Sequence, residues 1–170
     1  MIRTLVCALL CTVGTLVPAT AGDKPTPELK GIKVVSYKLS VQLPNKGRCA
    51  IDLKAWNTAI DFVANQSTKL KLIREADHFW PTDPSLLFSI LTTEMKSGCA
   101  ATLSAEVWAA LEPTKIIATD KFVDHPYTII WTERQLLSGP FATFSSFATE
   151  TSEQIMKSFV NDWARSQEEH

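Results

Sequence analysis

One stretch of the chain alternates so regularly that it constrains the fold more than any other feature. Apolar residues occupy every second position from 101 to 111: Ala101, Leu103, Ala105, Val107, Ala109 and Leu111. A period of two places these side chains on one face of a β-strand, with Trp108 among the residues on the other face. At about 3.3 Å per residue, the segment 99–111 is about 40 Å long, so we expect a bend or a bulge in it. The pattern predicts a domain built around a sheet.

Weaker patterns predict the remaining strands. Alternating or β-favouring residues indicate strands within 32–43, 69–72, 86–93, 115–121 and 127–133. The turn sequence at 95–98 joins the segment 86–93 to the long alternating strand as a hairpin. The expected sheet therefore has about four to six strands, in an antiparallel or mixed arrangement.

Two segments repeat apolar residues at helical spacing. In the first, Leu53, Trp56, Ile60 and Val63 form one stripe, and Asp52 is placed to cap the helix. In the second, apolar residues recur from Phe144 to Trp163, and Ser138-Gly139-Pro140 provides a helix start with proline in the first turn. Because each helix has a single apolar face, we expect both on one side of the sheet, in an α+β fold.

The N-terminus has the features of a secretory signal peptide over 1–21. Arg3 is followed by an apolar segment at 5–17 and by the small-residue cleavage site Ala19-Thr20-Ala21. We expect a flexible leader at 22–31, a single domain at 32–166 and a frayed tail at 167–170. The apolar segment is shorter than the roughly 20 residues of a membrane span, and no later run approaches that length. The mature protein is therefore expected to be periplasmic or secreted, with no membrane span.

Two cysteines remain after cleavage, Cys49 and Cys99. A thiol at a helix N-terminus, such as Cys49, can be a reactive thiolate. In an oxidising compartment, however, an isolated pair is more often a disulfide. Closing a loop of about 50 residues would remove about 4 kcal/mol of denatured-state freedom. We expect the disulfide, with the reactive thiol as the alternative.

The charge balance argues against nucleic acid as a partner. Removing Arg3 from the 17 basic residues leaves 16 against 18 acidic ones, a net charge of −2. The sequence contains no basic stripe that could follow a phosphate backbone.

Catalytic and metal-binding motifs are absent from the sequence. His78 and His125 each follow an aspartate, an order found in catalytic and metal sites, but both pairs lie in proline-containing loops, and His170 is terminal. No CxxC, HExxH, G-x-S-x-G or phosphate-binding glycine loop occurs. We therefore expect no enzyme, no cofactor and no metal; a hydrolase or metal enzyme using the loop histidines is the alternative.

Aromatic residues are the best candidates for contacts with a partner or ligand. Phe79 and Trp80 lie in an expected loop, and Trp108 lies on the outer face of the long strand. A covering helix or loop would instead make Trp108 structural. The small residues Ala101, Ala105 and Ala109 allow a helix to approach the sheet closely, or leave room for an apolar ligand.

Several short motifs carry a family resemblance: Cys49-Ala50-Ile51 before a helix, Ser97-Gly98-Cys99 before a strand, and the segments 130–140 and 156–163. The chain resembles small secreted or periplasmic proteins of Gram-negative bacteria, and its element order is similar to the N-terminal α+β domain of TolB-type and CsgG-type envelope proteins. The resemblance implies a fold and a compartment but no activity. The propeller repeats of TolB-type proteins are absent.

These observations favour an exported, non-enzymatic module that binds an envelope protein through a sheet edge or through exposed aromatics. The alternative is a carrier with a cavity for a small apolar ligand between sheet and helix.

Overall fold

The computed structural model describes residues 27–42, 47–74, 84–110, 114–116, 121–123 and 127–168. The predicted signal peptide at 1–21 lies outside the described residues, as do Phe79, Trp80 and the histidines His78, His125 and His170. The elements in chain order are η1 (Pro27–Leu29), β1 (Val34–Gln42), η2 (Gly47–Cys49), α1 (Leu53–Gln66), β2 (Lys71–Arg74), β3 (Ser85–Met95), β4 (Gly98–Ala110), β5 (Thr114–Ile116), β6 (Lys121–Val123), β7 (Tyr127–Gly139) and α2 (Phe144–Glu168).

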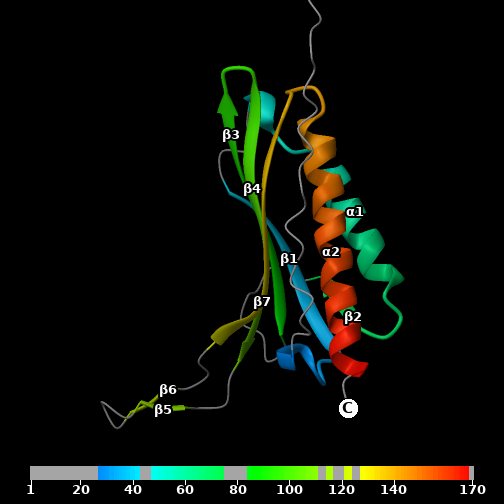
Figure 1. The fold of residues 1–170 in the computed structure, drawn as a ribbon, viewed down its shortest axis with the longest axis vertical. Helices are drawn as coiled ribbons and strands as arrows, with labels where there is room; N and C mark the ends of the chain where they lie inside the picture. The colour runs from blue at the N-terminus through cyan, green and yellow to red at the C-terminus, as the bar shows by residue number, and fades with distance from the viewer. Residues whose placement is uncertain are drawn as a thin grey trace, which may run out of the picture.

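The main sheet has five strands in the order β2-β1-β3-β4-β7. β1 is parallel to both β2 and β3, whereas β4 is antiparallel to both of its neighbours, β3 and β7. Both helices cover the same face of this sheet (Figure 1). The predicted α+β class, with a mixed sheet and two helices on one face, is confirmed.

The parallel half of the sheet is formed by a β-α-β crossover. Parallel neighbours cannot be joined by a tight turn, and α1 provides the connection between β1 and β2. The antiparallel half needs only the short 95–98 turn between β3 and β4, where Met95 pairs with Gly98. The predicted hairpin is therefore present.

The alternating segment forms β4 as predicted, although Ala109 is only half-buried and Leu111 lies outside the described residues. Ala101, Leu103, Ala105 and Val107 are buried on the helix-covered face, and Trp108 lies on the opposite face. The register with β7 shifts between Val107 and Trp108. Such a bulge lets a long strand follow the twist of the sheet.

The helix α1 begins as its sequence predicts, but Leu53, the first residue of the predicted apolar stripe, is 43% exposed. The Asp52 carboxylate accepts hydrogen bonds from the backbone N–H groups of Lys54 and Ala55, each at 3.0 Å. Trp56, Ile60 and Val63 are buried against the core.

The boundary between β7 and α2 differs from the expectation. The strand predicted over 127–133 continues to Gly139, which pairs with Cys99, and α2 begins at Phe144. Pro140 therefore ends a strand and does not lie in the first helical turn. Pairing with the full length of β4 outweighs the local helix-start chemistry, because each added residue extends a ladder that already exists.

The single strand expected at 115–121 is also wrong. Instead β5 and β6 are three-residue strands that pair with each other, Thr114 opposite Val123. The chain reverses direction between them, so one continuous strand cannot form. Figure 1 places this small ribbon away from the five-stranded sheet.

The predicted leader and tail are partly ordered. Leu29 is 0% exposed, so residues 27–31 are not a flexible segment. The side chain of Gln167 donates to the carbonyl of Leu29 and accepts from the N–H of Gly31, both at 3.0 Å, and α2 extends to Glu168. A buried leucine and two long-range hydrogen bonds hold the two ends of the domain together.

The core lies between the sheet and the two helices. Its largest fully buried side chains include Trp56, Phe88, Phe144 and Phe159. The rings of Trp131 in β7 and Phe159 in α2 are 5.1 Å apart, a distance typical of favourable aromatic pairs. Among the described helices, none combines the length and the apolar composition needed to cross a bilayer.

Candidate functional site

Cys49 and Cys99 form a disulfide, as predicted. Their Cα atoms are 5.6 Å apart, and both residues are buried. The bond joins η2, directly before α1, to the start of β4. The sulfur of Cys49 is therefore committed to a covalent link, and the reactive-thiol alternative has no support.

Several contacts surround this disulfide at one end of the sheet. Arg48 forms an ion pair with Glu94 and lies over the ring of Phe141, 3.9 Å from its centroid. A Cβ on Gly98 would lie only 2.4 Å from the carbonyl oxygen of Gly139, so the β3–β4 turn and the end of β7 touch through their backbones. The surroundings of the disulfide are those of a structural clamp.

The enzyme alternative depends on a metal-binding cluster or on the loop histidines. No group of three His, Cys, Asp or Glu side chains among them is placed to hold a metal ion. The histidines on which the enzyme alternative depends lie outside the described residues. That alternative stays a prediction.

Three of the five tryptophans are hydrogen-bond donors within the core. Trp56 donates to the hydroxyl of Ser152 at 2.7 Å, Trp131 to the carboxylate of Asp162 at 2.9 Å and Trp163 to the carbonyl of Ile32 at 2.7 Å. In the same order, these three hydrogen bonds join α1 to α2, β7 to α2, and the segment before β1 to the end of α2. Their role is structural, as the helical spacing of Trp56 and Trp163 predicted.

Trp108 differs from these three. It lies directly opposite Ser85 on the face away from the helices. Its indole nitrogen and the hydroxyl of Ser85 are both buried, and neither has a hydrogen-bond partner among the described residues. A buried donor without a hydrogen-bond partner lowers the stability of the folded state. The end of the sheet at Trp108 and Ser85 therefore differs from the rest of the surface opposite the helices. Phe79 and Trp80, the other two predicted contact residues, lie outside the described part of the chain.

We call the sheet surface opposite the helices the helix-free face. The register places its central part in three rows across β1, β3, β4 and β7: Gln42, Leu91, Thr102 and Leu136; Ser40, Ser89, Ser104 and Arg134; and Lys38, Leu87, Glu106 and Thr132. All twelve side chains are at least partly exposed. Leu136 is 79% exposed and Leu91 43%. The alternation of 101–111 predicted Thr102, Ser104, Glu106 and Trp108 on the outer face of one strand, but it did not show which residues of the other strands lie beside them.

One long edge of the sheet has no neighbouring strand in the described part of the chain. β7 pairs with β4 on one side and with no described strand on the other. Every second residue of an edge strand directs its N–H and C=O groups outward, where they can pair with another chain. At the opposite edge, β2 has only four residues. The open sheet edge considered from the sequence therefore corresponds to β7.

Glu133 and Gln135 are unusual residues on this edge strand. Both lie on the helix-covered face, opposite Ala105 and Leu103 of β4. Gln135 donates to one carboxylate oxygen of Glu133 at 3.1 Å, while the other oxygen is buried with no hydrogen-bond partner among the described residues. An inward-pointing charge on an edge strand is one of the features by which proteins limit uncontrolled strand pairing.

A buried tyrosine links β1, near the β2 edge of the sheet, to α1. The hydroxyl of Tyr37 in β1 donates to one oxygen of Asp61 at 2.7 Å, and Arg74 in β2 pairs with the other oxygen at 2.7 Å. Burial, and then the hydrogen bond to Asp61, raise the pKa of the Tyr37 hydroxyl. The neutral phenol acts as a fixed donor, which describes a structural link.

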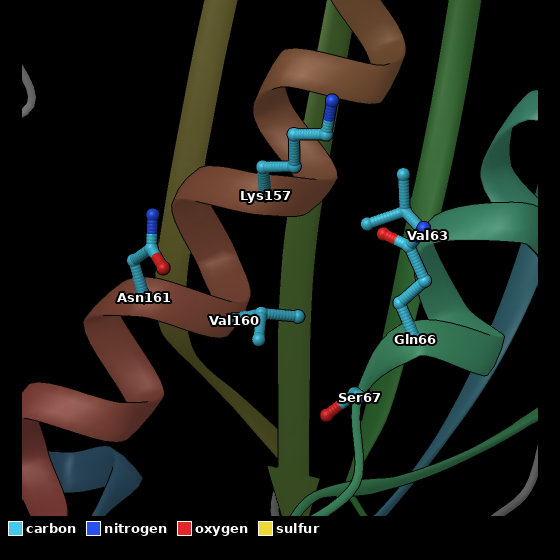
Figure 2. A pocket seen from close by; sticks show the side chains of 6 residues that line it. All are labelled: Val63, Gln66, Ser67, Lys157, Val160 and Asn161. Carbon is cyan, nitrogen blue, oxygen red and sulfur yellow. The ribbon is translucent and has the colours of Figure 1, made fainter.

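A small groove between the two helices opens on the outside of the domain. It has a volume of about 270 Å³ and is lined by Val63, Gln66, Ser67, Lys157, Val160 and Asn161. Figure 2 shows Val63 and Gln66 on α1 facing Lys157 and Val160 on α2 across the groove. Lys157 already pairs with Glu153, one turn earlier on α2, at 2.6 Å. The groove contains no buried polar group that would identify a ligand.

The space between sheet and helices is occupied by side chains. Ala101 and Ala105 are buried there, together with Phe88 from β3 and Phe159 from α2. Packing is therefore the observed role of the small residues of β4. The apolar-ligand carrier stays a prediction that no described cavity supports.

Comparisons with known proteins identify no family. No protein-family model matches the chain, and no curated protein matches it. Among solved structures, the crystal structure of an uncharacterized protein is similar, with a TM-score of 0.42 and 6% sequence identity. The similar region covers 76% of this chain and 91% of that one.

Proposed function

We propose that this protein is an exported, non-enzymatic binding module that accepts an extended strand of an envelope protein at the edge of β7. The observation that carries the proposal is the length of that edge: 13 residues with no described strand on the outer side. Strand addition uses backbone hydrogen bonds for affinity and side-chain contacts for specificity. Both long helices cover one face of the sheet, and neither extends it beyond β7.

The geometry favours the second half of β7 for such pairing. The bulge opposite Val107 and Trp108 interrupts the first half, whereas 132–139 is in regular register with β4. Within that regular segment Leu136 is 79% exposed and can contact a side chain of an added strand. The inward Glu133 discourages unselective pairing, so a specific partner would be needed.

Export is part of the same proposal. Residues 1–21 would act as a signal peptide, placing the mature chain in the periplasm or outside the cell. A buried disulfide between Cys49 and Cys99 supports this compartment, because stable structural disulfides are rare in a reducing cytosol. The proposal also uses the similarity in element order to TolB-type and CsgG-type domains. That similarity is the reason for proposing a protein of the cell envelope as the partner.

Site-specific photocrosslinking in the export compartment tests the proposal. A photoreactive side chain at Gln135, on the β7 edge, should give a discrete crosslinked protein, and the same group at exposed Gln154 on α2 should not. A second variant, Gln135→Lys, places a charge on the edge beside Glu133 and should abolish the complex without unfolding the domain. Gln154→Lys is the matched control with the same charge change.

Two further results decide the outcome. Amide hydrogen exchange of β7 peptides should slow when the captured partner is added to the purified protein, because outward N–H groups become hydrogen-bonded. Equal crosslinking from Gln135 and Gln154, or a complex that survives Gln135→Lys with unchanged exchange in β7, would refute strand acceptance at this edge.

A further inference from the structure

The helix-free face is large enough to form an interface. Away from its buried end at Ser36 and Ser85, the face comprises 38–42 of β1, 87–95 of β3, 98–106 of β4 and 132–139 of β7. At about 3.3 Å along the strand and about 4.8 Å across it per residue, these ranges have a flat area of about 500 Å². Two such faces together would bury about 1,000 Å² of flat surface, which is the lower bound for a specific interface. The side chains that project from the sheet add to this area. The size of the face thus matches a sheet-on-sheet contact.

The side chains on this face are compatible with a second copy of the same surface. The central row contains Ser40, Ser89 and Ser104, and the last two hydroxyls are hydrogen-bonded to each other at 2.7 Å. Leucines lie in the rows on either side, Leu91 in one and Leu87 in the other. Large side chains from one copy can therefore enter the row of small side chains of the other, as inner faces do in β-sandwiches.

The charges on the face do not oppose such a contact. Glu106 and Arg134 pair within one chain at 2.7 Å, so these two charges are already compensated before association. Lys38 lies toward the β1 side of the face, and its flexible stem lets the ammonium group reach solvent. A surface with internally paired charges can meet its own copy without strong like-charge repulsion.

We propose that two copies of this chain associate through their helix-free faces to form a symmetric dimer. The dimer has four layers, helices outside and two sheets inside, with the sheets about 10 Å apart. This inference does not depend on strand acceptance at β7, because face-to-face packing leaves the β7 edges at the sides of the sandwich.

Sedimentation equilibrium of the mature protein, purified from the export compartment with its disulfide intact, tests the proposal. The wild type should sediment at twice the mass of the chain at micromolar concentration. Leu91→Lys, on the central strand β3, should weaken dimerisation by roughly a hundredfold, since a buried ammonium without a partner costs several kcal/mol. Leu91 is 43% exposed in the single chain, so the folded monomer should tolerate this change.

Two control variants separate this surface from the others. Phe62→Lys makes the same change at a 58% exposed residue of α1 and should leave the dimer intact. Gln135→Lys should also leave it intact, because Gln135 lies on the helix-covered side of β7. Thr102→Arg, in register with Leu91 on β4, should reproduce the effect of Leu91→Lys.

Three results would overturn the inference. The first is a monomeric wild type at the highest soluble concentration. The second is a dimer that Leu91→Lys and Thr102→Arg leave unchanged. The third is a dimer that Phe62→Lys or Gln135→Lys dissociates, which would assign the contact to α1 or to the β7 edge. Circular dichroism of each variant confirms that it is folded, so a loss of dimer is not mistaken for unfolding.

Discussion

The indole N–H of Trp131 in β7 donates a 2.9 Å hydrogen bond to the carboxylate of Asp162 in α2. Both residues are buried, and the second oxygen of Asp162 pairs with Arg165 on the same helix. The bond connects the edge strand of the sheet to the helix that covers it. It holds β7 in place beneath α2, while no described strand pairs with the outer edge of β7.

Removing the acceptor of this bond should destabilise the domain. Asp162→Leu leaves the Trp131 N–H buried and unpaired, and we expect a loss of about 1–3 kcal/mol in the free energy of unfolding. Asp162→Asn retains an acceptor oxygen and should cost clearly less. Urea denaturation followed by tryptophan fluorescence measures both. Equal losses for the two variants would show that the hydrogen bond is not the stabilising feature.

Breaking the disulfide should have a larger effect. Cys49 and Cys99 are 50 positions apart, and releasing a loop of that length should cost about 4 kcal/mol. Denaturation of the double variant Cys49→Ala/Cys99→Ala, compared with the oxidised wild type, measures the loss. Reductant should lower the stability of the wild type and leave the double variant unchanged. A double variant as stable as the wild type would contradict the role of the bond as a clamp.

Two neighbouring glycines should respond differently to the same substitution. In Gly98→Ala the new Cβ would lie 2.4 Å from the carbonyl oxygen of Gly139, a backbone atom that cannot move without disturbing β7. In Gly139→Ala the nearest atom is 3.9 Å away, an ordinary contact. We expect Gly98→Ala to cost about 1–3 kcal/mol, as overpacking in a core does, and Gly139→Ala to cost little. Similar melting temperatures for the two variants would be inconsistent with this close approach.

Tyr37 should make the protein sensitive to alkaline pH. Burial and the bond to Asp61 raise the pKa of its hydroxyl in the folded state, whereas in the unfolded chain that pKa is about 10. Below pH 10 both states hold the proton and Tyr37 gives no pH dependence. Above pH 10 the unfolded state releases it more readily, so stability should fall by about 1.4 kcal/mol per pH unit.

The variant Tyr37→Phe isolates this contribution. It should be less stable than the wild type at neutral pH, because Asp61 loses a donor. Its stability should fall less steeply between pH 10 and 11 than that of the wild type, measured by denaturation at each pH. Parallel pH profiles for the two proteins would show that the Tyr37 proton is not linked to folding.

Local patterns predicted most of the fold. The period of two in β4 and the apolar stripe of α1 identified those elements because burial of one face imposes the same period on sequence and structure. The pairing of Cys49 with Cys99 followed from their number and the expected compartment. The length of β7 and the start of α2 were misjudged, because Pro140 is a common residue in a first helical turn but here follows a strand lengthened by pairing with β4.

The candidate surfaces were harder to predict. Trp108 was placed on the outer face correctly, but nothing local showed that Leu91, Thr102 and Leu136 would form one row. A row depends on the register between strands that are far apart in the sequence. The ends of the domain were misjudged for a similar reason, since the partners of Leu29 and Gln167 are more than a hundred residues away along the chain.

The sequence by itself determined the fold class: the positions of both helices and of most strands of the main sheet, the apolar face of each, and that two cysteines must be accommodated. These properties depend on neighbouring residues and on composition. Only the tertiary structure decided that β7 is the long edge strand, that it extends to Gly139, and which side chains of the helix-free face share a row. Those features arise from pairings between distant segments, whose choice depends on the packing of the whole core and not on any local period.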